Sequence, residues 1–284
     1  IIQNSPLRIE PWGPYFKACG GCQLQHLTYD AQLDYKTEKV RDALERIGHL
    51  RDVTVHPAIG MDEPWNYRNK AQFPVGLVKG RPVLGFYAAR SHNLINIEQC
   101  PIQHEVINRV MCLMREFIQT YNIPVYEEST HRGVLRHVVI KVGFRSHQLM
   151  VIVVTNGELH RKKEMVSLLK DGLPGITSII QNVQTKKTNV VLGEKNITLW
   201  GSDSILDAIG DLKFRISPLS FFQVNPVQIE KLYGKVLEYA GRKRSSMPTA
   251  GSAPFLFFLQ AKRQRFTEWK RSRRQSGMQK KMPD

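Results

Sequence analysis

The chain has 284 residues, of which 42% are hydrophobic and 23% charged, so it can bury a large core. No apolar run approaches the ~20 residues that a membrane helix needs, so we expect no membrane partner. Lysine and arginine outnumber aspartate and glutamate by 41 to 25, and this net charge of +16 makes a polyanion the expected partner. Four cysteines do not form a disulfide scaffold, and we expect a cytoplasmic monomer.

The positive charge is concentrated at the end of the chain. Residues 242–284 hold 12 of the 41 basic residues but only two acidic ones, Glu268 and Asp284. No helix or strand period runs through this segment, and one interpretation is a disordered basic tail that contacts nucleic acid. At the other end, residues 1–4 have neither a methionine nor the pattern of a signal peptide, which is typical of a fragment.

Hydrophobic periodicity predicts an α+β body with much antiparallel sheet. Residues 31–47 show an amphipathic helix pattern, with Asp30 as the expected N-cap, Gly48 as its end and four residues on its apolar side: Leu33, Val40, Leu44 and Ile47. The pattern predicts further helices at 104–121, 161–170 and 225–240. It predicts strands at 70–75, 81–87, 137–142, 148–154, 177–183, 189–192 and 197–199.

The cysteines form a candidate metal site. Cys19 and Cys22 flank two glycines, and thiolates at this spacing on a turn can bind one metal ion or one cluster. Cys100, followed by a proline, is a third candidate ligand. Clusters and structural zinc ions take four ligands, so ordinary loop and core cysteines are the alternative. Cys112 lies in an apolar helix pattern and is expected in the core.

The segment Cys19-Gly-Gly-Cys-Gln-Leu-Gln-His26 resembles the signature of the 23S rRNA (uracil-5-)-methyltransferases, the RumA/RlmD-like enzymes. In that family a C-x5-C-G-G-C run and a distant cysteine hold a [4Fe-4S] cluster. The resemblance implies that Cys19, Cys22 and Cys100 are metal ligands. The first cysteine of the run would fall at residue 13, where this chain has Gly13.

Other motifs extend the resemblance over about residues 1–241. Short pieces such as Y-R-N-K are weak alone, but the cysteine signature followed by S-P-x-S-F-F-Q-V-N is specific. The matching segments are Trp65–Lys70, Gly85–His92, Ile97–Gln103, Leu135–Lys141 and Ser217–Asn225.

The resemblance implies a reaction and a set of site residues. Enzymes of this family add a cysteine thiolate to C6 of a flipped-out uracil, methylate C5 from S-adenosylmethionine and remove the C5 proton with a base. Gln223 matches the residue that contacts the methionine end of S-adenosylmethionine, and Phe222 is expected in the core. The candidates for RNA contacts are Arg68, Lys70, Arg90, Arg136 and Phe221.

The resemblance also divides the chain into segments. Helix 31–47 would pack on the methyltransferase domain. The segments are a remnant of an N-terminal TRAM/OB-like barrel (1–12), a central substrate and iron–sulfur-type domain (13–216), the start of a truncated Rossmann-like methyltransferase domain (217–241) and the basic tail (242–284).

Residues 247–255 favour a specific hypothesis for that tail. The family continues here with a V-D-A-Y-C-G-I-G-T-I motif. One codon choice for this motif, read one nucleotide out of frame, encodes Met247-Pro-Thr-Ala-Gly-Ser-Ala-Pro-Phe255. We therefore expect residues from about 242 onward to be an out-of-frame translation. No cysteine follows Cys112, so no catalytic residue of the family is expected in this chain.

The sequence thus predicts an S-adenosylmethionine-dependent methyltransferase by descent that forms 5-methyluridine in 23S rRNA, with this chain itself inactive. A tRNA methyltransferase ranks lower, because those enzymes generally lack the C-G-G-C run. A non-enzymatic RNA-binding fragment and an iron–sulfur or zinc-binding fragment are the alternatives. We expect aggregation or proteolysis beyond Ser217, where Phe221, Leu232 and Val236 would lack a sheet.

Overall fold

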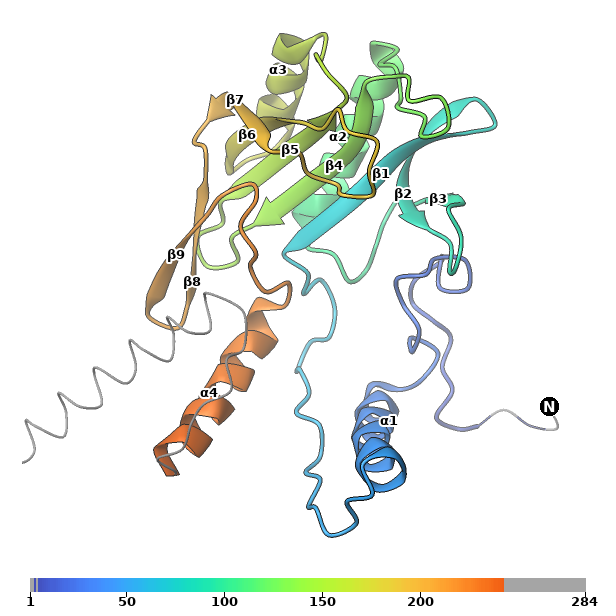
Figure 1. Ribbon diagram of the computed structural model, residues 1–284, viewed down its shortest axis with the longest axis vertical. Coiled ribbons are helices and arrows are strands. Elements are labelled where there is room, and N and C mark those ends of the chain that lie inside the picture. Colours follow the sequence, from blue (N-terminus) through green and yellow to red (C-terminus); the bar gives the residue numbers. More distant parts are fainter. Residues whose placement is uncertain (1–2, 4, 243–284) are drawn as a thin grey trace, which may run out of the picture.

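The structure is a computed structural model that describes residue 3 and residues 5–242 (Figure 1). The expected barrel remnant is therefore described only in part, and the tail from residue 243, with the frameshift hypothesis, lies outside the described residues. In chain order the elements are α1 (Tyr29–Asp42), the π-helical η1 (Ala43–Ile47), β1 (Lys70–Val78), β2 (Arg81–Tyr87), β3 (Leu94–Asn96), α2 (Glu105–Thr120), β4 (Leu135–Val142), β5 (Leu149–Thr155), α3 (Lys162–Gly172), β6 (Ile176–Val183), β7 (Lys195–Gly201), β8 (Ile205–Ile209), β9 (Leu212–Ile216) and α4 (Pro226–Arg242).

Seven strands form one mixed sheet in the order β3-β2-β1-β4-β5-β6-β7. All neighbours are antiparallel except β5 and β6, which α3 connects as a crossover. Every residue of β5 is buried, as expected for a central strand covered on both faces. The α+β class expected from the sequence is confirmed.

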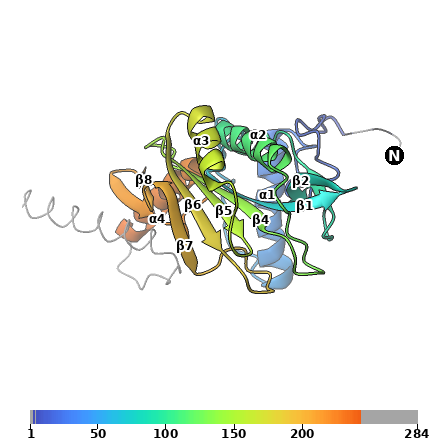
Figure 2. The ribbon, with the colours of Figure 1, turned by 90° about the horizontal axis from the view of Figure 1, so that it is seen from above.

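Helices α2 and α3 lie side by side on one face of the sheet (Figure 2). Their apolar sides meet alternate strand residues in the main core, which includes Phe73, Met111 and Phe117, all fully buried. On the opposite face, Val139 and Ile152 belong to a second core; its other members include residues of the β8–β9 hairpin and α4. The hairpin and α4 are thus held on the sheet by apolar burial.

Helices α1 and α4 extend from the same end of the sheet (Figure 1). The segment 58–61 joins them: the Ala58 amide donates to Thr37 Oγ1 of α1 (2.9 Å), and Lys231 Nζ of α4 donates to the Gly60 carbonyl (2.7 Å). On the apolar side expected for helix 31–47, Val40 is 52% exposed and Ile47 is 81% exposed. Leu33 and Leu44 on the same side are half-buried, so this side of the helix is covered only in part.

Most predicted elements are confirmed, and the deviations are local. No strand forms at 189–192, whereas β3, β8 and β9 were not predicted. The N-cap of α1 is Thr28, whose Oγ1 accepts from the Ala31 amide, and not Asp30. The core position expected for Cys112 is wrong, because this residue is exposed on α2. Within the described residues, none of the helices combines the length and apolarity needed to cross a bilayer.

Candidate functional site

The three cysteines of the family signature come together beside the end of β2. Cys19 pairs with Ala88 as an isolated bridge, and the Gly20 amide donates to the Tyr87 carbonyl (3.1 Å). Cys100 follows β3, and its amide donates to Asn108 Oδ1 of α2 (2.9 Å). These bonds place residues from distant parts of the sequence in one neighbourhood.

Burial makes two of the thiols, those of Cys22 and Cys100, weaker acids. It raises the pKa of Cys22 to about 11, with Cys100 and Cys19 as further causes. Burial also raises the pKa of Cys100. Even so, no group of three or more His, Cys, Asp or Glu side chains within residues 5–242 has the arrangement needed to hold a metal ion.

The position of the family's first cysteine is a glycine that hydrogen-bonds to Gln25. The Gly13 amide donates to Gln25 Oε1 (3.0 Å), and a Cβ placed on Gly13 would lie 2.7 Å from that oxygen. Gln25 is itself buried and hydrogen-bonds to Cys22. The residues present therefore do not fit a four-thiolate cluster, because Gly13 supplies no fourth thiol.

We expect the purified chain to hold no stoichiometric iron–sulfur cluster. Iron and acid-labile sulfide should stay well below four atoms each per chain after anaerobic reconstitution. Cys22→Ser should give the same values as the parent chain. Four iron atoms and four sulfides per chain that disappear in Cys22→Ser would contradict this expectation.

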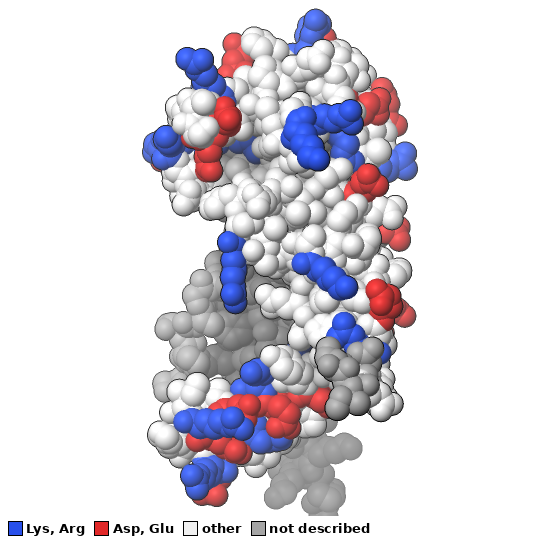
Figure 3. Space-filling view, turned by 90° about the vertical axis from the view of Figure 1, so that its right-hand side faces the viewer, with Lys and Arg blue, Asp and Glu red and all other residues white. Residues whose placement is uncertain are grey.

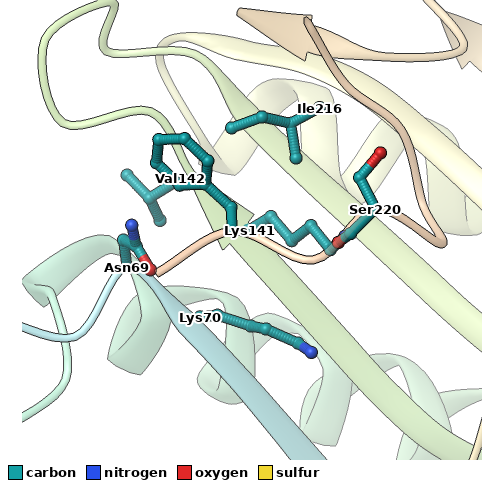
Figure 4. Close-up of a pocket in the computed structure, with 7 residues that line it drawn as sticks. Asn69, Lys70, Lys141, Val142, Ile216 and Ser220 are labelled. Carbon is teal, nitrogen blue, oxygen red and sulfur yellow. The ribbon is translucent and has the colours of Figure 1, made fainter. Parts of the chain in front are cut away.

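A lysine pair, of which Lys141 is buried and Lys70 is half-buried, forms the second part of the site, around a small pocket (Figure 4). Lys70 of β1 and Lys141 of β4 are register partners. The Lys141 amine donates to the carbonyls of Ser217 and Ser220, at 2.8 Å each. These bonds fix the start of the segment Ser217–Asn225 against the sheet.

The charge of this lysine pair is weakened by its surroundings. Burial, and then the charge of Lys70, lower the pKa of Lys141 to about 7. Burial, and then Arg68, lower the pKa of Lys70. A neutral amine carries two N–H donors, which matches the two carbonyls that Lys141 reaches.

Asn69 anchors the other end of the same segment. Its amide donates to the Val224 carbonyl (3.0 Å), and its Nδ2 donates to the Gln223 carbonyl (2.9 Å). Phe222 is 7% exposed and packs against Phe214 (ring centroids 5.8 Å apart), which confirms its expected burial.

The segment presents two of the predicted site residues at the surface. Phe221 is 62% exposed. The side-chain amide of Gln223 is partly exposed and makes no hydrogen bond to any described residue. Both groups are therefore free to meet a ligand.

The basic candidates occupy different environments. Arg68 lies close enough to Cys22 and Cys100 to influence their pKa values, and Arg90 is exposed in the turn after β2 with a positive φ of 57°. Arg136 is 3% exposed, and its guanidinium donates to the Gln184, Lys186 and Thr188 carbonyls. These bonds give Arg136 a structural role in the segment after β6 and do not favour a phosphate contact.

Sequence reasoning missed Lys141, Asn69 and Gln25. Lys141 and Asn69 lie within segments that resemble the family, but their partners lie more than 70 residues away in the chain. Strand alternation was the available signal, because it places Lys141 on the same face as His137 and Val139. No sequence signal pairs Gln25 with Gly13.

Surface charge is mixed on the side drawn in Figure 3. Lys and Arg are interspersed with Asp and Glu there, and both signs lie side by side over α1, where Arg41 pairs with Glu38 and Arg46 with Asp42. Such exposed pairs contribute little to stability.

Sequence relatives of this chain are RNA methyltransferases. It is 48% identical over 244 residues to an uncharacterized RNA methyltransferase of Clostridium tetani. This match covers 86% of this chain and 53% of the relative. It is 49% identical over 241 residues to an uncharacterized RNA methyltransferase of Halalkalibacterium halodurans. That match covers 84% of this chain and 53% of the relative. The chain thus spans about half the length of the curated relatives it matches. No protein-family profile matches it.

Among solved structures, the chain resembles the Pyrococcus abyssi tRNA (uracil-54, C5)-methyltransferase in complex with S-adenosyl-L-homocysteine. The TM-score is 0.64 at 28% identity, over 84% of this chain and 52% of that one. The sequence and fold together show that this chain is similar to RNA methyltransferases over about half of their length. Within that class, the resemblance to the RNA (uracil-5-)-methyltransferase family is confirmed.

Proposed function

We propose that this chain is the substrate-binding part of an S-adenosylmethionine-dependent RNA (uracil-5-)-methyltransferase that acts on 23S rRNA. The observation that supports this most is the docked segment Ser217–Asn225. Lys141 and Asn69 hold it, while Gln223 and Phe221 stay free. The structural relative acts on tRNA, and the cysteine signature at 19–26 favours rRNA for this chain.

Gln223 is the proposed contact to the cofactor. S-adenosylmethionine supplies the methyl group when it is bound, and the free amide of Gln223 suits the amino and carboxylate groups at its methionine end. The relative's complex with S-adenosyl-L-homocysteine supports this cofactor.

Lys70, Arg68 and Phe221 are the proposed RNA contacts of this segment. Lys70 lies on the sheet face that carries the segment, and Arg68 lowers its pKa, so the two cations are close together. A phosphate between them would relieve their repulsion. The exposed Phe221 ring offers a stacking surface for a base.

We further propose that 13–216 is the central substrate domain and that residues 217–241 lead into the methyltransferase domain. Segment 58–61 ties α1 to α4, which supports an arrangement in which α1 also packs on that domain. In the family the nucleophile for addition to uracil C6 is a cysteine downstream of the segment that matches here, and residues 113–284 contain no cysteine. The chain should bind RNA without methylating it.

A methyl-transfer assay tests this proposal. We expect the chain, incubated with tritiated S-adenosylmethionine and a 23S rRNA transcript, to leave the RNA unlabelled while retaining it on a filter. The Pyrococcus abyssi enzyme on a tRNA transcript is the positive control for transfer. Label at C5 of uridine with this chain would refute the inactivity, and failure to retain RNA would refute the substrate-binding role.

A further inference from the structure

A second cavity, of about 730 Å³, lies on the sheet away from α2 and α3 and has no role in the site above. Its volume falls within the range of small-ligand sites. Pro74 and Gly76 of β1 and His137 of β4 contribute to its lining. Strand alternation places Pro74 and Lys70 on one side of β1, and the two residues are about 13 Å apart along the strand. The cavity and the lysine pair therefore share one sheet face.

The rim of the cavity is built and rigid. Thr188, Asn189 and Val191 contribute to it from the segment between β6 and β7, which crosses in front of the sheet in Figure 1. Arg136 holds this segment through three carbonyls, the last being that of Thr188 (3.3 Å). The same guanidinium stacks over the Tyr126 ring at 4.2 Å from its centroid. A ligand would meet a preformed rim.

One wall is aromatic. Tyr87 is 41% exposed and lies 5.6 Å from His92 between ring centroids, and both line the cavity. Glu128 also lines it and lies close enough to Tyr87 to raise the pKa of its hydroxyl, after the effect of burial. The wall therefore combines a flat ring with an acceptor carboxylate.

The far side of the cavity offers a neutral imidazole. Burial, and then Arg136, lower the pKa of His137 to about 4, so this ring is uncharged at neutral pH. Its Nδ1 is buried without a hydrogen-bond partner among the described residues. A neutral imidazole has one donor and one acceptor nitrogen.

These features fit a flat heteroaromatic ring better than a phosphate. Lys79 and Arg136 are balanced by Glu127 and Glu128 in the lining, so the cavity has no net attraction for an anion. We propose that the cavity binds an unpaired nucleobase of the RNA substrate, other than the target uridine, stacked on Tyr87 with its polar edge toward Glu128 and His137. This inference rests on the proposed function.

The carboxylate sets a preference among bases. Glu128 can accept a hydrogen bond from an exocyclic amino group, which adenine and cytosine carry and uracil lacks. The cavity should therefore favour adenine or cytosine over uracil. The distance of about 13 Å between Pro74 in the cavity and Lys70 corresponds to roughly four stacked nucleotides. One RNA strand can therefore reach both the cavity and the lysine pair.

Binding of short RNAs tests the inference with the full chain. The probes are fluorescein-labelled hexamers of adenylate, cytidylate and uridylate, followed by fluorescence anisotropy at one salt concentration. We expect the adenylate or cytidylate hexamer to bind more tightly than the uridylate hexamer. Tyr87→Ala should weaken that binding at least about fivefold, because it removes a stacked base, while Tyr87→Phe should stay within about twofold. Glu128→Gln should remove the preference over uridylate.

Tyr35→Ala is the matched control, since Tyr35 is 44% exposed on α1 and does not line the cavity. Thermal melts of the Tyr87 variants establish that they fold. If the hexamers bind and Tyr87→Ala behaves like Tyr35→Ala, the cavity inference is overturned while the RNA-binding role stands. If the parent chain binds none of the hexamers, the cavity inference and the proposed RNA-binding role are both contradicted.

Discussion

Replacing Lys141 with methionine will lower the free energy of unfolding by about 3 kcal/mol at pH 9. Methionine matches the length of the buried stem but cannot donate to the carbonyls of Ser217 and Ser220. The half-buried Ser220 carbonyl loses its partner, at a cost of about 1–3 kcal/mol, and the Ser217 carbonyl keeps only the bond from the Ser220 amide. Urea unfolding of the parent chain and the variant measures the difference.

The same variant carries a pH signature. The folded pKa of Lys141 is about 7, below its ordinary 10.5, so the unfolded chain binds more protons between these values. This group therefore adds stability as the pH rises, by roughly 2 kcal/mol from pH 7 to 9. The gain should be absent in Lys141→Met. Lys213→Met on the exposed side of β9 is the control, with a change within about 0.5 kcal/mol. An equal pH dependence in parent and variant would show that Lys141 is not the titrating group.

Gly85→Ala will destabilise the chain by about 3 kcal/mol. Gly85 pairs with Asn96 between β2 and β3, and a Cβ there would lie 1.7 Å from the Ile95 carbonyl oxygen. Backbone cannot move aside as a flexible side chain does, so β3 must shift or separate from β2. Urea unfolding again measures the effect.

Gly234→Ala is the matched control for that substitution. Gly234 lies in α4, and a Cβ at this position meets nothing within 4 Å. Alanine has the higher helix propensity, so this variant should gain about 0.5–1 kcal/mol. A loss below about 1 kcal/mol for Gly85→Ala would mean that β3 does not depend on its close approach to β2.

The sheet and its covering helices were predictable because their patterns are long and regular. α2 carries an apolar stripe that the sequence shows directly, and β5 is an uninterrupted apolar run. The apolar run 189–192 looked like a strand as well. It forms a rim segment instead, because side chains take the pairing groups of Val190: its carbonyl accepts from Gln184 Nε2 and its amide donates to Thr188 Oγ1.

The residues of the candidate site were predictable from motifs, but the contacts that position them were not. The motifs identified Gln223, Phe221 and the cysteine loop, but the bonds that place them join residues from distant parts of the chain. Lys141 and Ser217 are 76 residues apart, and only the folded sheet brings them together. Likewise, the hydrogen bond from the Gly13 amide to Gln25 joins two loop positions that spacing alone does not pair.

The salt dependence of RNA binding tests the central claim most directly. A 23S rRNA transcript and a tRNA transcript would be titrated with the full chain between about 50 and 200 mM salt. We expect the association constant to fall linearly with salt concentration on logarithmic axes, because binding releases counterions, and we expect rRNA to bind more tightly than tRNA. Undetectable binding of both RNAs at the lowest salt would contradict the claim that this chain is the substrate-binding part of an RNA methyltransferase.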